Sequence, residues 1–131
     1  MAHSRMIGSV HVLEPADYAR WLSGQIPSES MIAAGARLFT ARGCSGCHAP
    51  NAAVRAPLLD GIYSKPVALA TGAVIIADEQ YLHDSILLPQ KDVTAGYAPV
   101  MPTYQGVLSE EDVMQLVAYL KSLTDEKGAT R

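Results

Sequence analysis

Two cysteines and a histidine lie close enough in the sequence to act on one group. The segment Cys44-Ser45-Gly46-Cys47-His48 holds both cysteines of the chain. Two thiols at this separation can add to the two vinyl groups of one haem, and the adjacent imidazole then lies under the iron. A disulfide between such close cysteines would close too small a loop to stabilise a fold. The motif therefore predicts one covalent haem c, with Cys44 and Cys47 as thioether anchors and His48 as an iron ligand.

Two other chemistries use a Cys-x-x-Cys pattern, and each requires a particular context. A zinc half-site needs a second pair of Cys or His ligands, whereas His11 and His83 lie far apart and alone. A thioredoxin-like redox pair needs a strand followed by a helix, and that pattern does not surround the motif. The sequence favours haem over both alternatives.

A second axial ligand is expected from the loop that precedes the last helix. Met101 lies there in Ala98-Pro99-Val100-Met101-Pro102. The two prolines stiffen the loop and remove competing backbone donors, so a thioether can be held at a fixed depth. The alternatives are a Met101 that only fills the core, or ligation by another side chain, namely His83, Met6, Met31 or Met114. A His48 and Met101 pair leaves no open iron position for oxygen or peroxide, which favours electron transfer over catalysis at the iron.

Composition limits the class of protein. The chain has 131 residues, of which 49% are hydrophobic and 18% charged, as expected for one small globular domain with a short extra segment. The formal net charge is −3, and the sequence has no basic cluster. Both observations argue against nucleic-acid binding. No apolar stretch approaches the roughly 20 residues that span a bilayer. The first residues also lack the pattern of a signal peptide.

The first 30 residues differ in pattern from the rest. Residues 7–13 alternate in the manner of a strand end, and a short helical turn is expected over residues 16–22. A segment rich in small polar residues, 24–30, follows as a linker. The haem domain is expected to begin near Met31.

The remaining chain predicts a mainly helical domain. We expect a first helix over residues 33–42 that Gly43 ends, and a helix over residues 79–87 that Asp78 caps. A small hairpin is expected over residues 66–76, turning at Thr71-Gly72. A last helix is expected to begin at Ser109 with a capping-box partner, Asp112, and to bury one face, made of Val113, Leu116, Val117 and Leu120.

Over residues 31–124 these motifs resemble the class I cytochrome c family, in the family's order. The resemblance implies an all-α fold of three to five helices wrapped round one covalent haem, with a small β-hairpin. In that family a glycine and an aromatic residue of the first helix pack against an aromatic residue of the last. Gly35, Phe39 and Tyr119 are in those positions.

The resemblance also implies a partner for the proximal imidazole. The family has a proline after the haem motif whose carbonyl accepts a hydrogen bond from the imidazole, and Pro57 is in that position. Ala56 departs from the glycine that more often precedes that proline.

A closer resemblance is to the cytochrome c domain at the end of cytochrome c oxidase subunit II in caa3-type oxidases. It rests on segments 77–82, 85–89 and 95–102. In that family an aromatic residue at the position of Tyr97 can contact a haem propionate. The first residues, His3-Ser4-Arg5-Met6 with Tyr18 downstream, resemble the end of that subunit's binuclear-copper domain, where the His and the Met are copper ligands. Without the bridging cysteines, His3 and Met6 are expected to bind no copper.

These resemblances imply three parts and one role. Residues 1–24 would be the remnant of a cupredoxin-like copper domain, 25–30 a linker and 31–131 the cytochrome c domain. The domain, not itself an enzyme, would accept electrons from a respiratory donor and pass them to the copper domain of the same subunit, which serves oxidase subunit I. Thioether attachment implies the periplasmic or outer face of the bacterial membrane, with a membrane-anchored parent. A free-standing soluble cytochrome c, and a haem enzyme or gas sensor, are the alternatives.

Overall fold

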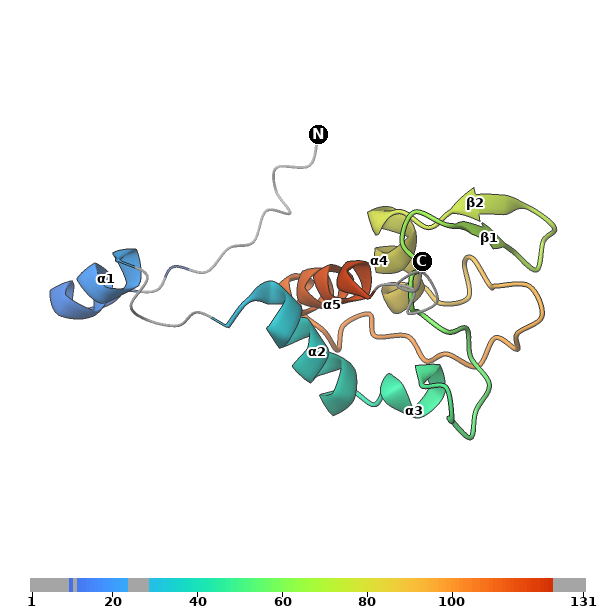
Figure 1. Ribbon diagram of the computed structural model, residues 1–131, viewed down its shortest axis with the longest axis horizontal. Helices are drawn as coiled ribbons and strands as arrows, with labels where there is room; N and C mark the ends of the chain where they lie inside the picture. Colours follow the sequence, from blue (N-terminus) through green and yellow to red (C-terminus); the bar gives the residue numbers. More distant parts are fainter. Residues whose placement is uncertain (1–9, 11, 24–28, 124–131) are drawn as a thin grey trace, which may run out of the picture.

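The computed structural model describes residues 10, 12–23 and 29–123. This part forms five helices and one two-stranded antiparallel sheet (Figure 1). The helices are α1 (Pro15–Leu22), α2 (Met31–Ala41), α3 (Ser45–His48), α4 (Glu79–Leu87) and α5 (Glu110–Ser122), and the strands are β1 (Pro66–Ala68) and β2 (Val74–Ile76). The mainly helical fold with a small hairpin confirms the predicted class. None of the described helices is long and apolar enough to cross a membrane.

Side-chain caps define the starts of α4 and α5. The Asp78 carboxylate accepts a hydrogen bond from the backbone N–H of Tyr81 at 2.8 Å. At α5, the Ser109 hydroxyl accepts from the Asp112 N–H, and the Asp112 carboxylate accepts from the Ser109 N–H, both at 3.1 Å. This reciprocal pair is a capping box in which Asp replaces the usual Glu or Gln. Both predicted helix starts are confirmed.

Helix α2 begins two residues before the predicted start. The Ser30 hydroxyl accepts from the Ala33 N–H at 3.1 Å, so Met31 and Ile32 belong to the first turn. At the other end Gly43 follows the Arg42 cap with a φ of 78°, a left-handed conformation that glycine adopts without steric cost. The stop predicted at Gly43 is confirmed, and Cys44 follows directly.

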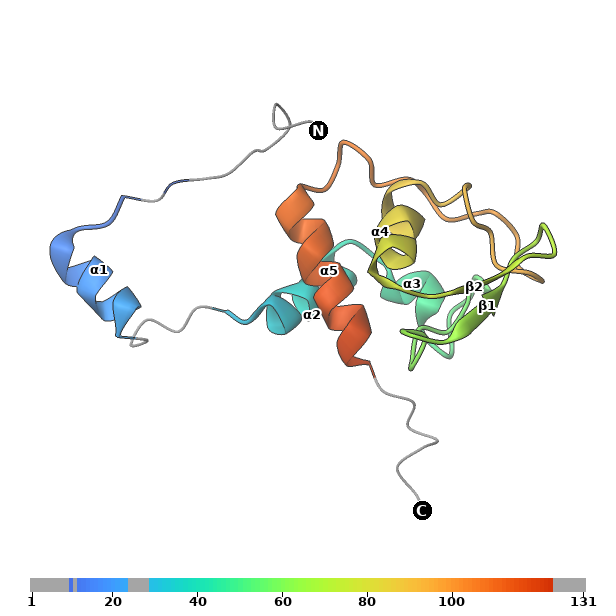
Figure 2. The same cartoon turned by 90° about the horizontal axis from the view of Figure 1, so that it is seen from above.

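Helices α2 and α5 cross in close contact, as both views show (Figures 1 and 2). A Cβ placed on Gly35 would lie 2.0 Å from the Gln115 carbonyl oxygen, so only glycine allows this approach. Beside it the rings of Phe39 and Tyr119 lie 5.5 Å apart between centroids, at 58° to each other. The packing implied for these residues by the family resemblance is present.

The core lies between α2, α4, α5 and the hairpin. Val113 and Ala77 are fully buried, and the expected α5 face is buried along its length. The remaining core residues are Leu38, Val67, Leu69, Tyr81, Leu82, Ile86, Leu108, Leu116, Val117 and Leu120. Burying each such side chain stabilises the fold by about 1.5 to 3 kcal/mol before entropy is counted.

The hairpin pairs β1 with β2 in the register Pro66 with Ile76 and Ala68 with Val74. Beyond the strands, Leu69 bridges Thr94 in the long loop before α5. The hairpin therefore joins the core, through Val67, and supports one end of that loop.

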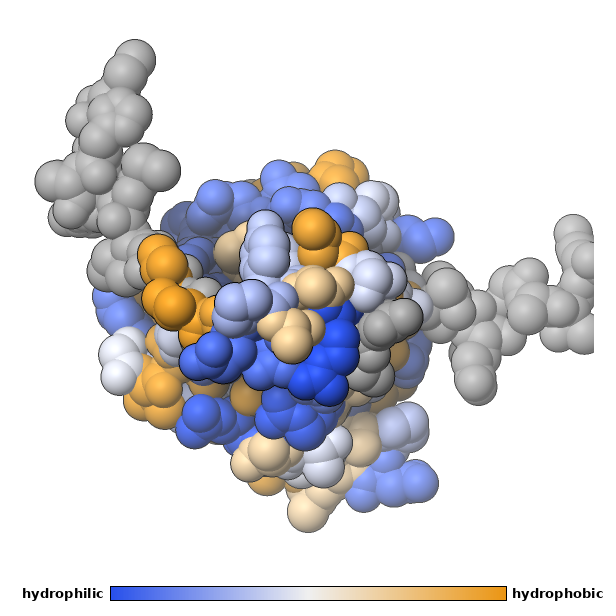
Figure 3. All heavy atoms as spheres, turned by 90° about the vertical axis from the view of Figure 1, so that its left-hand side faces the viewer, coloured by the Kyte–Doolittle hydropathy of each residue, from blue (hydrophilic) through white to orange (hydrophobic). Residues whose placement is uncertain are grey.

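Helix α1 has no buried residue. Its Tyr18 and Trp21 rings stack on each other at 5.8 Å, and each residue is 51% exposed. Figures 1 and 2 show α1 apart from the other helices. Figure 3 views the molecule from the side on which α1 lies and shows hydrophobic and hydrophilic residues interspersed on that face. The expected strand lies mostly outside the described residues, as does the linker apart from residues 29 and 30.

We predict that Gly35→Ala lowers the free energy of unfolding by about 2 kcal/mol. An alanine gains about 1 kcal/mol of helix propensity, but overpacking against a backbone carbonyl costs about 3 kcal/mol. Urea unfolding of the haem-loaded protein measures the difference. Gly46→Ala is the matched control, because a Cβ there meets nothing within 4 Å. Equal stability of the two variants would contradict the close approach.

Candidate haem site

A cavity of about 280 Å³ lies beside α3 and α4. Its other walls are loop residues 54–62 and 89–104, with Leu120 of α5. Most of these side chains are apolar, which suits a large flat cofactor with few polar groups.

The haem motif forms one turn of helix at the edge of this cavity. The His48 N–H donates to the Cys44 carbonyl at 3.0 Å, and the Cys44 N–H donates to the Phe39 carbonyl at the end of α2, also at 3.0 Å. Residues spaced by three and four share one face of a helix, so Cys44, Cys47 and His48 project to the same side. All three line the cavity, and both thiols are free of a disulfide.

The His48 ring is oriented by the backbone of the following loop. Its Nδ1 lies 2.7 Å from the Pro57 carbonyl oxygen. Because a carbonyl only accepts, Nδ1 carries the proton and donates, and Nε2 keeps its lone pair for a metal. Pro57 also lines the cavity.

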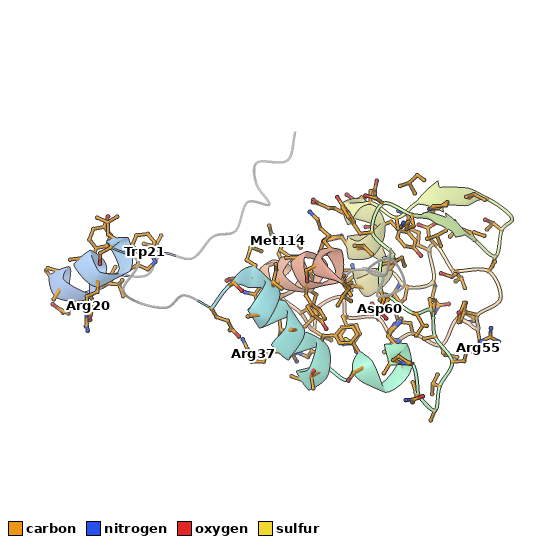
Figure 4. All side chains as sticks on the ribbon, viewed as in Figure 1. Arg20, Trp21, Arg37, Arg55, Asp60 and Met114 are labelled. Carbon is orange, nitrogen blue, oxygen red and sulfur yellow. The ribbon has the colours of Figure 1, made fainter. Side chains whose placement is uncertain are left out.

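Met101 and Tyr97, both expected at the site from sequence, line the same cavity. The other candidate ligands lie elsewhere. Met31, Met114 and His83 line a separate groove on α4 and α5. Figure 4 shows Met114 far from Arg55, a cavity residue. His83 instead hydrogen-bonds to the carboxylates of Glu110 and Asp84, and Met6 lies outside the described residues.

Sequence reasoning missed two side chains of the cavity wall. The guanidinium of Arg55 lies 5.2 Å from the Tyr97 ring centroid, and Arg55 is the only Lys or Arg among the described lining residues. Tyr104 donates from its hydroxyl to the Arg42 carbonyl at 2.9 Å and so fastens the Met101 loop to the end of α2. In the sequence, Arg55 could have been noticed as a cation two residues before Pro57, and Tyr104 as an aromatic residue three positions after Met101.

The donor set and the lining fit a haem. Two thiols and an imidazole project from one helical turn, and a thioether lies in the same cavity. On the α4 wall Ser85 Oγ is buried without a hydrogen-bond partner among the described residues. A buried polar atom of this kind is expected to find its partner in a bound group.

Burial raises the pKa of the Cys44 thiol, opposed by a hydrogen bond with Tyr104. Burial also raises the pKa of Tyr104, and the nearby Cys44 adds to this effect. Before haem attachment, both groups are therefore protonated at neutral pH.

An ion pair with a largely buried carboxylate joins α4 to the loop that follows it. The Asp84 side chain is 12% exposed and accepts hydrogen bonds from Gln80 Nε2 at 2.7 Å and Lys91 Nζ at 2.5 Å. The bond from Lys91 holds the pKa of this carboxyl below its ordinary value, against the opposing effect of burial. The pair ties α4 to the start of the Met101 loop.

The family model for cytochrome c matches residues 32–124, most of the chain. The chain belongs to the cytochrome c family. The cytochrome c domain therefore carries a covalent c-type haem, for which Cys44 and Cys47 fit the attachment motif, and it transfers electrons.

The chain is also similar to an oxidase subunit. It is 29% identical over 129 residues to cytochrome c oxidase subunit 2 of Alkalihalophilus pseudofirmus. The match covers 93% of this chain and 36% of the relative, so the chain spans about a third of that protein's length. Because so much of the chain is covered, the match extends well upstream of residue 32.

We predict that Asp84→Asn reduces the acid sensitivity of the cytochrome c domain. A carboxyl whose folded pKa is depressed stabilises the fold above its unfolded pKa of about 4, and this stability is lost as pH falls through the folded value. The variant should be less stable than the parent at pH 7, and the two should converge in acid. Urea unfolding between pH 7 and about pH 2 gives the two curves.

Lys91→Met should also be less stable than the parent at pH 7 and converge with it in acid, because it removes the bond that holds the folded pKa of Asp84 below its ordinary value. Lys121→Met controls for the loss of one positive charge at a pair whose carboxylate, Glu79, is 62% exposed. Parallel curves for the parent and Asp84→Asn would contradict a stabilising role for the Asp84 charge.

Proposed function

We propose that this cytochrome c domain holds its haem iron between His48 and Met101 and carries single electrons into a terminal oxidase. The observation behind the proposal is that both side chains line one cavity, with His48 Nδ1 bonded to the Pro57 carbonyl. Nε2 of the same ring is then the coordinating atom. Cys44 and Cys47, on the same helical turn, form the thioether bonds.

The two axial ligands decide which haem chemistry is open to the chain. The bound haem supplies a one-electron couple between ferric and ferrous iron. His48 and Met101 would together hold the iron, and the soft thioether would favour the ferrous state and raise the potential. An iron held in this way would have no open position for oxygen or peroxide. The arrangement therefore favours an electron carrier over the alternative of a haem enzyme or gas sensor.

Tyr97 and Arg55 form a polar part of an otherwise apolar wall. We assign to them the contact with the haem propionates, since a phenol and a guanidinium both donate hydrogen bonds to carboxylates. The Arg55 guanidinium over the Tyr97 ring links the two loops at this point.

Electrons are proposed to enter and leave at the cavity mouth. Val54 and Val100 line the cavity, yet they are 44% and 59% exposed. Weak redox encounters bury little surface, and a small apolar patch of this kind suits brief contact with a donor protein.

The proposed parent is a caa3-type cytochrome c oxidase, as its subunit II. Residues 1–24 would then be the end of the binuclear-copper domain, 25–30 a linker and 31–131 the cytochrome c domain. The match to an oxidase subunit 2 upstream of residue 32 supports this division. So does α1, whose exposed Tyr18 and Trp21 offer an aromatic surface to a neighbouring domain.

In this assembly the domain accepts electrons from a respiratory donor and passes them to the copper domain of its own subunit. Oxidase subunit I then reduces oxygen. The domain would lie on the periplasmic or outer face of the bacterial membrane, held there by the membrane-anchored parent. A free-standing soluble cytochrome c, the nearest alternative, would need neither the copper domain nor the anchor.

We predict that Met101→Ala abolishes the weak far-red charge-transfer band of the ferric protein. The band arises from the thioether–iron bond, so it reports Met101 directly. The open position should also let cyanide bind rapidly without unfolding. Absorption spectra of the oxidised protein, before and after cyanide, measure both effects.

Met114→Ala is the matched control, because Met114 is 53% exposed on the separate groove. It should keep the band and the slow reaction with cyanide. A parent protein without the band, or with fast cyanide binding, would overturn the six-coordinate electron carrier.

The oxidase origin predicts the coding sequence upstream of Met1. It should encode a pair of cysteines shortly before His3, as a binuclear copper centre requires, and two membrane-spanning segments further upstream. Sequencing the gene tests this. A stop codon or a secretory leader directly before Met1 would favour the free-standing cytochrome c.

A further inference from the structure

The loop that carries Met101 is held on both sides of the methionine, on one side by the turn that follows α4 and on the other by the end of α4 itself. Gln90 Nε2 donates to the Pro99 carbonyl at 3.0 Å. The Thr103 hydroxyl donates to the Leu87 carbonyl at 2.6 Å. Pro99 and Thr103 are the second residues before and after Met101, so the two bonds flank it symmetrically.

The end of α4 supplies acceptors that the helix itself leaves open. The last carbonyls of a helix have no intrahelical partner. Thr103 satisfies Leu87, and the backbone N–H of Tyr104 donates to the Ile86 carbonyl at 3.3 Å. The Thr103 oxygen also accepts from the Gln105 N–H at 3.1 Å, which leaves its own proton for Leu87.

The loop has few backbone donors of its own for this purpose. Pro99 and Pro102 lack an N–H. Besides the backbone bond from Tyr104, the attachment near Met101 comes from the side chains of Gln90 and Thr103. Because α4, through Ser85 and Ile86, and the following turn, through Pro89, are both walls of the cavity, these bonds set the height of Met101 over those walls.

We propose that Gln90 and Thr103 are positioning residues that keep the Met101 thioether on the haem iron. They act through the loop backbone and touch neither the metal nor the haem. The proposal rests on the proposed ligation by Met101. Without either bond the loop moves away from the wall more often, and the fraction of protein with an open iron position rises.

Imidazole binding to the ferric protein measures that fraction. An external ligand can bind only when Met101 is off the iron, so its apparent affinity rises with the population of the open state. A residue that only stabilised the fold would change the unfolding midpoint and leave the imidazole affinity of the folded protein unchanged.

The experiment compares Thr103→Val and Gln90→Leu with the parent, all haem-loaded, by titration with imidazole. Losing one hydrogen bond should tighten imidazole binding roughly threefold to tenfold in Thr103→Val. Gln90→Leu should have a smaller effect, about twofold to threefold, because the bond that it removes is longer, at 3.0 Å against 2.6 Å. The reduction potential should shift to lower values in both, because the open state favours ferric iron.

Two controls separate the hydroxyl from the side-chain volume and from general effects. Thr103→Ser keeps the hydroxyl and should restore the parent's imidazole affinity and potential. Thr71→Val removes a hydroxyl of the hairpin turn, which accepts from the Ala73 N–H, and should change neither quantity. Gln90→Leu alters an exposed side chain, so the test does not depend on the folding of Thr103→Val.

The outcomes distinguish the two proposals. A parent protein that lacks the far-red band would overturn ligation by Met101, and the positioning role with it. A parent with the band, together with unchanged imidazole affinity and potential in both variants, would overturn the positioning role alone.

Discussion

The contact between α2 and α5 at Gly35 is the constraint on which the two halves of the site depend. A backbone carbonyl of α5 lies where a Cβ of residue 35 would be. Helix α2 leads through Gly43 directly into the haem motif, and α5 begins directly after the loop that carries Met101. The crossing of these helices therefore sets how far the proximal motif lies from the distal loop. Helix α4 closes the cavity between them and holds that loop.

The site combines a rigid helical turn, which carries the haem motif, with a more adjustable loop, which carries Met101. The thiols and the imidazole project from one helical turn, whose geometry follows from the spacing of the motif. Met101 has no secondary structure of its own, and its place depends on hydrogen bonds to α4 and, through Tyr104, to α2. A soft, flexible thioether tolerates small displacements that an imidazole would not. With Met101 as the proposed iron ligand, its loop is where the potential can be tuned without altering haem attachment.

Local chemistry explains why much of the fold could be read from the sequence. The caps at Asp78 and Ser109 and the stop at Gly43 each involve residues within a few positions, so their signals are complete in a short segment. The start of α2 was missed by two residues because Ser30 was assigned to the linker. The haem motif is equally local. Met101, outside that motif, was proposed as a ligand from its flanking prolines rather than from a contact.

The contacts that hold the site together could not be predicted in the same way. Tyr104 and Arg42 are 62 positions apart, and Thr103 and Leu87 are 16 apart. Arg55 meets Tyr97 only after two loops have folded against each other. No periodicity or spacing marks such pairs, because their partners are backbone carbonyls or aromatic faces that any segment can offer. Their identity depends on the helix crossing and appears only in three dimensions.

The bond between His48 and Pro57 bears on how such a site can change over evolution. The acceptor is a main-chain oxygen, which every amino acid carries, so the orientation of the imidazole depends on the path of the loop rather than on side-chain chemistry at that position. Neighbouring residues can drift, as Ala56 has from the family's more frequent glycine, while the bond persists. An insertion or deletion between His48 and Pro57 would have a different outcome, because it moves the oxygen itself. Selection here acts on the length and course of a loop.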